Sequence, residues 1–188
     1  MAPILGIYAS SASPFAFANS YESIATVTVG AGGSSSITFS SIPSTYQHLQ
    51  IRGIARDSRS NAATNLYIQY NSDTGANYTA HNLYGNGSTA VASFEGTSQT
   101  SALAARVAGN NSASNAFGGF VIDVLDYANA NKYKTSRSLA GHEDNSSGAI
   151  WLISGLWLNT SAVTSITITP VTSPILQYSS FALYGVKG

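Results

Sequence analysis

Hydrophobic and polar residues alternate along much of the chain, in short stretches that end at turn-forming residues. In residues 65–71, NLYIQYN, the side chains of Leu66, Ile68 and Tyr70 would lie on one side of an extended chain and those of the intervening residues on the other. A repeat of two residues is typical of a β-strand with one buried face. The pattern therefore predicts a chain made mainly of short strands.

Runs of this kind recur from Glu22 to Val186, with turn-forming residues between them. We expect strands at residues 22–29, 36–42, 46–55, 65–71, 77–85, 89–94, 117–125, 134–141, 149–158, 163–170 and 179–186. No window shows the 3.6-residue apolar repeat of an amphipathic helix, although the Ala-rich residues 99–109 are expected to form a short helix or a loop. A polar loop is expected at residues 126–134.

Many short strands joined by turns are typical of two antiparallel sheets that pack face to face. Eight or more strands favour a jelly roll. The length of 188 residues indicates a single domain. We therefore expect an all-β protein, an antiparallel and jelly-roll-like β-sandwich that occupies residues 21–188 and follows an extended N-terminal arm.

The first 20 residues differ in character from the rest of the chain. They are biased toward apolar residues and contain no Lys or Arg, and Ser and Pro interrupt the apolar stretch, so a signal peptide is not expected despite the sequence Ala-Phe-Ala at 16–18. Residues 1–20 are expected to form an exposed arm that folds onto the domain or docks into a partner by strand addition. Its anchoring side chains would be Ile4, Leu5, Ile7 and Tyr8.

Charge is scarce in this sequence. Charged residues make up only 9% of the chain, and acids and bases balance at a net charge of zero. Because a surface that follows phosphates needs a basic excess, nucleic-acid binding is not expected. No stretch approaches the roughly 20 apolar residues of a membrane span. Neutral hydroxyl and amide groups replace the charges and cost less to desolvate than ions, which favours packing against neighbouring proteins.

Residues 73–76, Asp-Thr-Gly-Ala, match the short signature around the catalytic carboxylate of aspartic proteases. Those enzymes need a second carboxylate that shares a proton with the first. The sequence has no second Asp-Thr-Gly, and the polar turn formers Asn71 and Ser72 precede Asp73. We therefore interpret Asp73 as part of the turn of a β-hairpin, with Gly75 available for a positive φ.

The histidines do not form a pattern that indicates a metal site. His48, His81 and His142 are far apart in sequence, and the chain has no cysteine. Residues 141–144, Gly-His-Glu-Asp, lack the ligand spacing of a metal site and are expected to form a solvated loop. We therefore expect no bound metal and no cofactor.

Asp123 is the other carboxylate that the pattern singles out, because it falls in the middle of an expected strand. Such a residue either faces solvent or forms an ion pair, and Arg52, Arg56 or Arg137 could supply the partner. The chain also lacks a Gly-x-Ser-x-Gly nucleophile motif and a phosphate-binding loop. With no convincing catalytic group, we expect that the protein is not an enzyme.

Aromatic residues leave sugar binding as an alternative. An aromatic platform would comprise Tyr67, Tyr78, Tyr84, Tyr127, Tyr133 and Trp157, with Asn side chains to bind sugar hydroxyls. Tyrosine is also common in strands and at interfaces, so packing is the competing explanation for these residues.

Several stretches resemble a group of small structural proteins of tailed bacteriophages. The resemblance lies in the local sequence and the order of these stretches, which are residues 21–59, 70–88, 121–141, 154–170 and 181–188. In addition, PILGIYASS at residues 3–11 is similar to the short leader of such proteins. The resemblance implies a virion protein with a β-sandwich body, a homotrimer on the capsid exterior that acts as a decoration or cement protein. Members of the group occur on the head or the tail, so the implied partner is the major capsid protein or a tail protein.

Two functions are therefore expected in order of preference. The first is a capsid decoration protein that binds the outer shell and stabilises it through protein–protein contacts, with the arm buried against the shell or a sister subunit. The alternative is a tail-fibre or receptor-binding module that contacts host surface glycans, for which the arm would be the attachment to the tail.

Overall fold

The computed structural model describes residues 20–145 and 147–188, and within these ranges the chain forms twelve strands and no helix. The N-terminal arm, including Ile4, Leu5, Ile7 and Tyr8, lies outside the described residues apart from its last residue, Ser20. The strands are β1 (Tyr21–Thr28), β2 (Ile37–Phe39), β3 (His48–Ala55), β4 (Ala63–Tyr70), β5 (Tyr78–Gly85), β6 (Ala90–Phe94), β7 (Ala102–Ala108), β8 (Gly118–Leu125), β9 (Lys134–Glu143), β10 (Gly148–Trp157), β11 (Ile166–Pro170) and β12 (Ser180–Val186).

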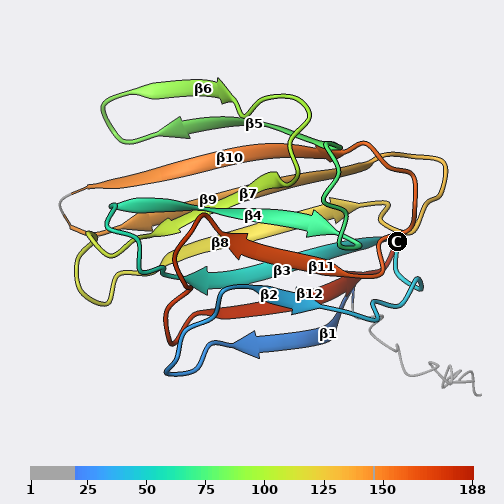
Figure 1. Ribbon diagram of the computed structural model, residues 1–188, viewed down its shortest axis with the longest axis horizontal. Helices are drawn as coiled ribbons and strands as arrows, with labels where there is room; N and C mark the ends of the chain where they lie inside the picture. Colours follow the sequence, from blue (N-terminus) through green and yellow to red (C-terminus); the bar gives the residue numbers. More distant parts are fainter. Residues whose placement is uncertain (1–19, 146) are drawn as a thin grey trace, which may run out of the picture.

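The strands form two antiparallel sheets that lie against each other (Figure 1). The larger sheet has eight strands in the order β1-β12-β3-β8-β9-β10-β5-β6. The smaller sheet has four strands in the order β2-β11-β4-β7. The prediction of an all-β, antiparallel, sandwich-like protein is therefore confirmed. Each of the eleven runs expected to be a strand overlaps one of the observed strands, and β7 was not expected to be a strand.

Alternating burial explains why these residues form strands. In β4, Leu66 and Ile68 are fully buried while Asn65, Tyr67 and Gln69, which alternate with them, are partly exposed, as the repeat of two predicted. β4 ends where Asn71 and Ser72 take positive φ angles of 52° and 56°, and the chain then turns into β5. The turn expected around Asp73 is present, but the expectation of a hairpin is wrong, because β4 and β5 belong to different sheets and do not pair with each other. The positive φ angles lie at Asn71 and Ser72 and not at Gly75.

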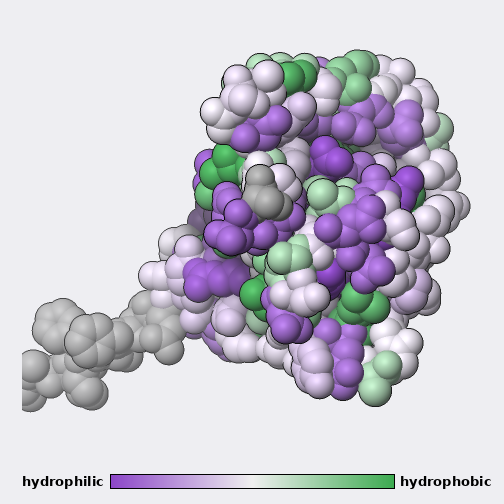
Figure 2. All heavy atoms as spheres, turned by 90° about the vertical axis from the view of Figure 1, so that its left-hand side faces the viewer, coloured by the Kyte–Doolittle hydropathy of each residue, from purple (hydrophilic) through white to green (hydrophobic). Residues whose placement is uncertain are grey.

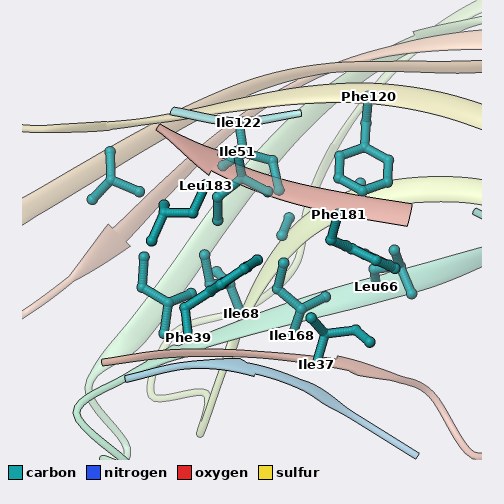
Figure 3. Packing of buried hydrophobic residues seen from close by; sticks show 14 of the residues in the cluster. Ile37, Phe39, Ile51, Leu66, Ile68, Phe120, Ile122, Ile168, Phe181 and Leu183 are labelled. Atoms are coloured by element: carbon teal, nitrogen blue, oxygen red, sulfur yellow. The ribbon is translucent and has the colours of Figure 1, made fainter. Parts of the chain in front are cut away.

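The core lies between the two sheets (Figure 3). The smaller sheet contributes aliphatic and aromatic side chains that point toward those of β3, β8 and β12 in the larger sheet, and all of them are nearly or fully buried. Burying each such side chain stabilises the fold by about 1.5–3 kcal/mol. The labelled members are Ile37, Phe39, Leu66, Ile68 and Ile168 from the smaller sheet and Ile51, Phe120, Ile122, Phe181 and Leu183 from the larger.

The expectation of a helix or loop at residues 99–109 is wrong, because residues 102–108 form β7 at the edge of the smaller sheet. Small side chains let β7 approach the larger sheet closely. Ser138 on β9 donates a hydrogen bond of 2.5 Å from its hydroxyl to the carbonyl of Ala104. A Cβ added to Gly118 on β8 would lie 2.8 Å from Cα of Val107. The alanines therefore serve close packing between sheets.

Candidate functional site

Large apolar side chains gather on the face of the larger sheet that points away from the smaller sheet. Leu83 on β5, Leu139 on β9, and Ile150 and Leu152 on β10 are 50%, 52%, 56% and 55% exposed. Leu152 is directly opposite Leu83 on one side and Leu139 on the other. Val121 on β8 continues the row opposite Leu139. We call the surface formed by these five residues the outer apolar face.

The sequence of β10 explains how this surface arises. Trp151 and Ile153 point into the sandwich and are buried, so the alternation of the strand places Ile150 and Leu152 on the opposite face. Both faces of β10 are therefore apolar, although only one of them packs inside the described sandwich. A solvated sheet face normally carries polar residues.

Glycines beside Ile150 make the outer apolar face uneven. Ile150 is opposite Gly85 on β5 and Gly141 on β9, and Gly141 is opposite Gly119 on β8. Without side chains at these positions, a hollow of about 480 Å³ opens over Gly119 and Gly141. A second hollow of about 280 Å³ lies over Gly85. The walls of the two hollows are mainly apolar and include Val121, Leu139, Ile150, Leu83 and Leu152.

Charged and amide side chains border the outer apolar face on β3, β8 and β9. Asp123 accepts hydrogen bonds from Gln50 at 2.7 Å and from Arg137 at 3.2 Å, and Gln50 accepts one from Arg52 at 2.6 Å. The guanidinium of Arg52 also lies over the rings of Tyr21 and Tyr184. We call Gln50, Arg52, Asp123 and Arg137 the polar ridge. Of the alternatives given for Asp123, the structure has the ion pair, and Arg137 is its partner.

The end of the sandwich that lies at the left of Figure 1 is more polar on its surface than the outer apolar face. Figure 2 shows this end as a mosaic in which hydrophilic surface surrounds smaller hydrophobic patches. Isolated exposed apolar residues are normal for a soluble domain, whereas a contiguous apolar patch marks a surface for interaction. The outer apolar face is therefore the candidate functional site, and its chemistry suits contact with another apolar surface.

Asp73, the residue that resembled a catalytic carboxylate, serves the turn between β4 and β5. Its carboxylate accepts hydrogen bonds from the indole of Trp157 at 2.7 Å, the amide of Asn77 at 2.9 Å and the backbone N–H of Gly75 at 2.8 Å. These bonds, that from Trp157 foremost, lower the pKa of Asp73. A carboxylate that is held in its charged form by three donors fixes the turn, as the sequence indicated.

The solvated loop expected at residues 141–144 is wrong for His142. This residue lies in β9 and is buried, and its ring stacks on Trp151 with centroids 5.7 Å apart. Burial is the main reason that its pKa lies below the usual value. The strand continues through Glu143, whose side chain is exposed. The error arose because inward or outward orientation depends on the pairing of β9, which the four residues themselves do not reveal.

The residues that could have formed metal or sugar sites are dispersed. Among residues 20–145 and 147–188, no group of three or more His, Asp or Glu side chains could hold a metal ion. Of the residues in the expected aromatic platform, Tyr78, Tyr127 and Trp157 are buried, and Tyr133 is 52% exposed. The six aromatic residues therefore do not form one exposed stacking surface.

Comparison with protein-family models, curated proteins and solved structures finds no match to this chain. Within the described ranges, no helix has the length and apolar character needed to cross a membrane. The outer apolar face and the fold are therefore the observations from which a function can be inferred.

The outer apolar face was not predicted from the amino-acid sequence. The one available signal was residues 149–158, AIWLISGLWL, where apolar residues occupy both faces of the expected strand. Such a strand is expected to be covered on both sides. Leu83 and Leu139 give no such signal, because each stands among polar or small residues and joins the patch only through strand pairing.

Proposed function

We propose that this protein is a structural protein of a bacteriophage virion that binds the outer shell as a decoration protein and stabilises it through protein–protein contacts. The outer apolar face is the observation that supports the proposal. Four of its five side chains, those of Leu83, Leu139, Ile150 and Leu152, lie on adjacent strands and are 50–56% exposed in the single chain. Covering them by a neighbouring protein is favourable, and no chemical step is required.

The stabilisation would come from many copies of a modest contact. Burying one exposed aliphatic side chain contributes about 1.5–3 kcal/mol before the costs of ordering the partners are counted. The arm residues Ile4, Leu5, Ile7 and Tyr8 would add further apolar contacts against the shell or a sister subunit. Because copies on a shell are held at fixed spacing, simultaneous contacts reinforce one another.

The description of the sandwich as a jelly roll is part of this proposal, and the strand order supports it. Strands β1, β12, β3 and β8 are adjacent in the larger sheet, opposite the β2-β11-β4-β7 sheet. When the hairpins β5-β6 and β9-β10 are set aside, the chain changes sheet between β1 and β2, β2 and β3, β3 and β4, β7 and β8, β8 and β11, and β11 and β12, and β4 and β7 stay in one sheet, as in two interleaved Greek keys. The hairpins β5-β6 and β9-β10 then extend the larger sheet, and they carry most of the outer apolar face.

Location on the capsid exterior, attachment to the major capsid protein and assembly as a homotrimer rest on the resemblance to phage structural proteins. Imaging of intact particles of the phage that encodes the chain tests this location. We expect density for the sandwich on the head surface, with the outer apolar face covered by a neighbouring protein. Density only at a tail fibre, together with binding of the isolated chain to host cells, would instead favour a receptor-binding module.

Rebinding to stripped particles tests the role of the surface itself. The double variant Leu139→Asp/Leu152→Asp places two carboxylates on the outer apolar face, and it should lose binding to particles from which the native protein has been removed. The matched control is Leu158→Asp/Tyr178→Asp, which changes two side chains that are 43% and 73% exposed outside that face. Equal binding by both variants would contradict the proposal.

A further inference from the structure

We propose that the outer apolar face of one copy binds the N-terminal segment of a neighbouring copy, through Ile4, Leu5, Ile7 and Tyr8. The inference rests on the proposed function in treating this face as a protein-binding surface, and it goes further by naming the occupant. The contact would join identical chains to each other, in addition to any contact with the shell.

The chemistry of the segment fits that of the face. Residues 1–19 contain no charged side chain, and the five residues of the outer apolar face are all aliphatic. The two hollows over Gly85, Gly119 and Gly141 have glycine in their floors and apolar side chains in their walls, so they can accept projecting aliphatic or aromatic side chains. An uncharged apolar segment loses little hydration when it enters such a surface.

The segment is also long enough to reach this face. The described chain begins at Ser20, beside β1, which is the edge strand of the sheet that carries the face. Twelve residues separate Tyr8 from Tyr21 and span up to about 40 Å when extended. Five strand spacings separate β1 from β10, which is about 24 Å. Length alone therefore permits binding to the same copy or to another.

The polar ridge favours a neighbouring copy. Along the strands, Gln50, Asp123 and Arg137 are in register with one another and lie between the Tyr21 end of the sheet and the row of Val121 and Leu139. A segment that started at its own Tyr21 would cross these hydrogen-bonded and charged groups and strip water from them at a cost in free energy.

A segment from another copy can approach across the opposite edge of the sheet. The edge strand there is β6, AVASF, which has no charged residue. Each copy would then donate one segment and receive one. Such a contact joins two different surfaces, so it produces closed rings or open chains and not a symmetric pair of faces.

The full-length protein tests this through complementary variants. The segment variant Ile4→Asp/Leu5→Asp/Ile7→Asp keeps an intact face, and the face variant Leu139→Asp/Leu152→Asp keeps an intact segment. We expect the unmodified chain and the control Leu158→Asp/Tyr178→Asp to self-associate in sedimentation velocity, and each test variant alone to be monomeric. A mixture of the two test variants should form a one-to-one complex and nothing larger, because only one intact contact remains. Circular dichroism checks that every variant is folded.

Any of three other outcomes would overturn the inference. An unmodified chain that stays monomeric at its highest soluble concentration has no such contact. A segment variant that still dimerises indicates that two faces bind each other. A mixture that fails to associate, although the unmodified chain does, indicates a different interface. Particle binding by a chain that is monomeric in solution would keep the proposed function and reject only this inference.

Discussion

At the scale of single residues, the sandwich holds buried cations with backbone carbonyls. Lys134 is completely buried, and its ammonium group donates hydrogen bonds to the carbonyls of Asn129, Lys132 and Thr160 at 2.7, 2.7 and 2.9 Å. Burial lowers the pKa of Lys134. The three carbonyls belong to the loops before β9 and after β10, so this one side chain ties both loops together.

Replacing Lys134 by Met should destabilise the fold. The three carbonyls would lose their donor, and a buried polar group without a partner costs about 1–3 kcal/mol. Urea unfolding followed by fluorescence measures the change. Lys132→Met is the control, because that side chain is 59% exposed and its pairing with Asp126 is worth about 0–1 kcal/mol. Equal effects of the two substitutions would contradict the role given to Lys134.

His142 predicts a dependence of stability on pH. Among the described residues neither ring nitrogen has a hydrogen-bond partner, and burial lowers its pKa, with nearby Arg106 acting in the same direction and Asp144 and Glu143 against it. The unfolded chain binds a proton near pH 6.5, whereas the folded chain binds it only at lower pH. The free energy of unfolding should therefore fall as the pH decreases from about 7.5 to 5.5.

Two variants isolate this effect in urea titrations at several pH values. His142→Phe keeps a ring against Trp151 but cannot take up a proton, so its stability should change less with pH than that of the unmodified chain. His81→Gln, which changes an exposed residue on β5, should retain the full dependence. An unchanged pH profile in His142→Phe would show that other groups cause it.

These residues show how far the sequence could be used to predict the site. The turn at Asp73 was predicted correctly because a turn depends on neighbours in sequence, here Asn71, Ser72 and Gly75, whereas the hairpin was wrong because strand pairing, which places β4 and β5 in different sheets, depends on distant residues. His142 was placed in a solvated loop because its burial depends on Trp151, which reaches it through the pairing of β9 with β10. The outer apolar face was missed for the same reason, since pairing and not sequence order brings Leu83, Leu139 and Leu152 together.

At the scale of elements, β7 lies so close to the larger sheet that only small side chains fit at several positions between them. The strand pattern predicted the other strands because their apolar residues alternate with polar ones. It failed for β7 because Ala102, Leu103, Ala104 and Ala105 are all buried, so no alternation is visible. Alanine is also a strong helix former in isolation, and packing between the sheets overrides that preference here.

Two adjacent glycines on β8 allow a direct test of this packing. A Cβ at Gly118 would lie 2.8 Å from Cα of Val107 and 3.0 Å from the backbone nitrogen of Ala108, whereas a Cβ at Gly119 would meet nothing within 4 Å. Gly118→Ala should therefore lower the free energy of unfolding by about 1–3 kcal/mol, because the β7 backbone must move. Gly119→Ala should leave it unchanged or raise it by up to about 1 kcal/mol.

Urea unfolding of both variants decides the question. Similar stability of Gly118→Ala and the unmodified chain would mean that β7 does not lie against β8 as described. Gly119 also forms part of the floor of the larger hollow on the outer apolar face. Gly119→Ala should therefore weaken binding of the N-terminal segment to that face while the fold stays intact. The two variants thus separate the role of Gly118 in packing from the role of Gly119 in binding.

At the scale of the whole molecule, the two faces of the larger sheet have different roles. One face closes the core with the smaller sheet, which lies against it in Figure 1. The other face has an apolar row across β8, β9, β10 and β5. The charges of the ridge satisfy one another, because Asp123 and Arg137 form an ion pair and Gln50 links Asp123 to Arg52. Association through this surface would therefore depend on apolar burial more than on charge.

Salt dependence tests that conclusion. With a net charge of zero and no charged residue among the five of the outer apolar face, raising NaCl from 0.05 to 0.5 M should change the self-association constant by less than about threefold, since salt mainly screens exposed charges. Ammonium sulfate should strengthen association, because excluded salts favour burial of apolar surface. Sedimentation equilibrium in each salt measures both effects, with the face variant Leu139→Asp/Leu152→Asp as the control. Dissociation at moderate NaCl would instead identify paired charges as the main source of the contact.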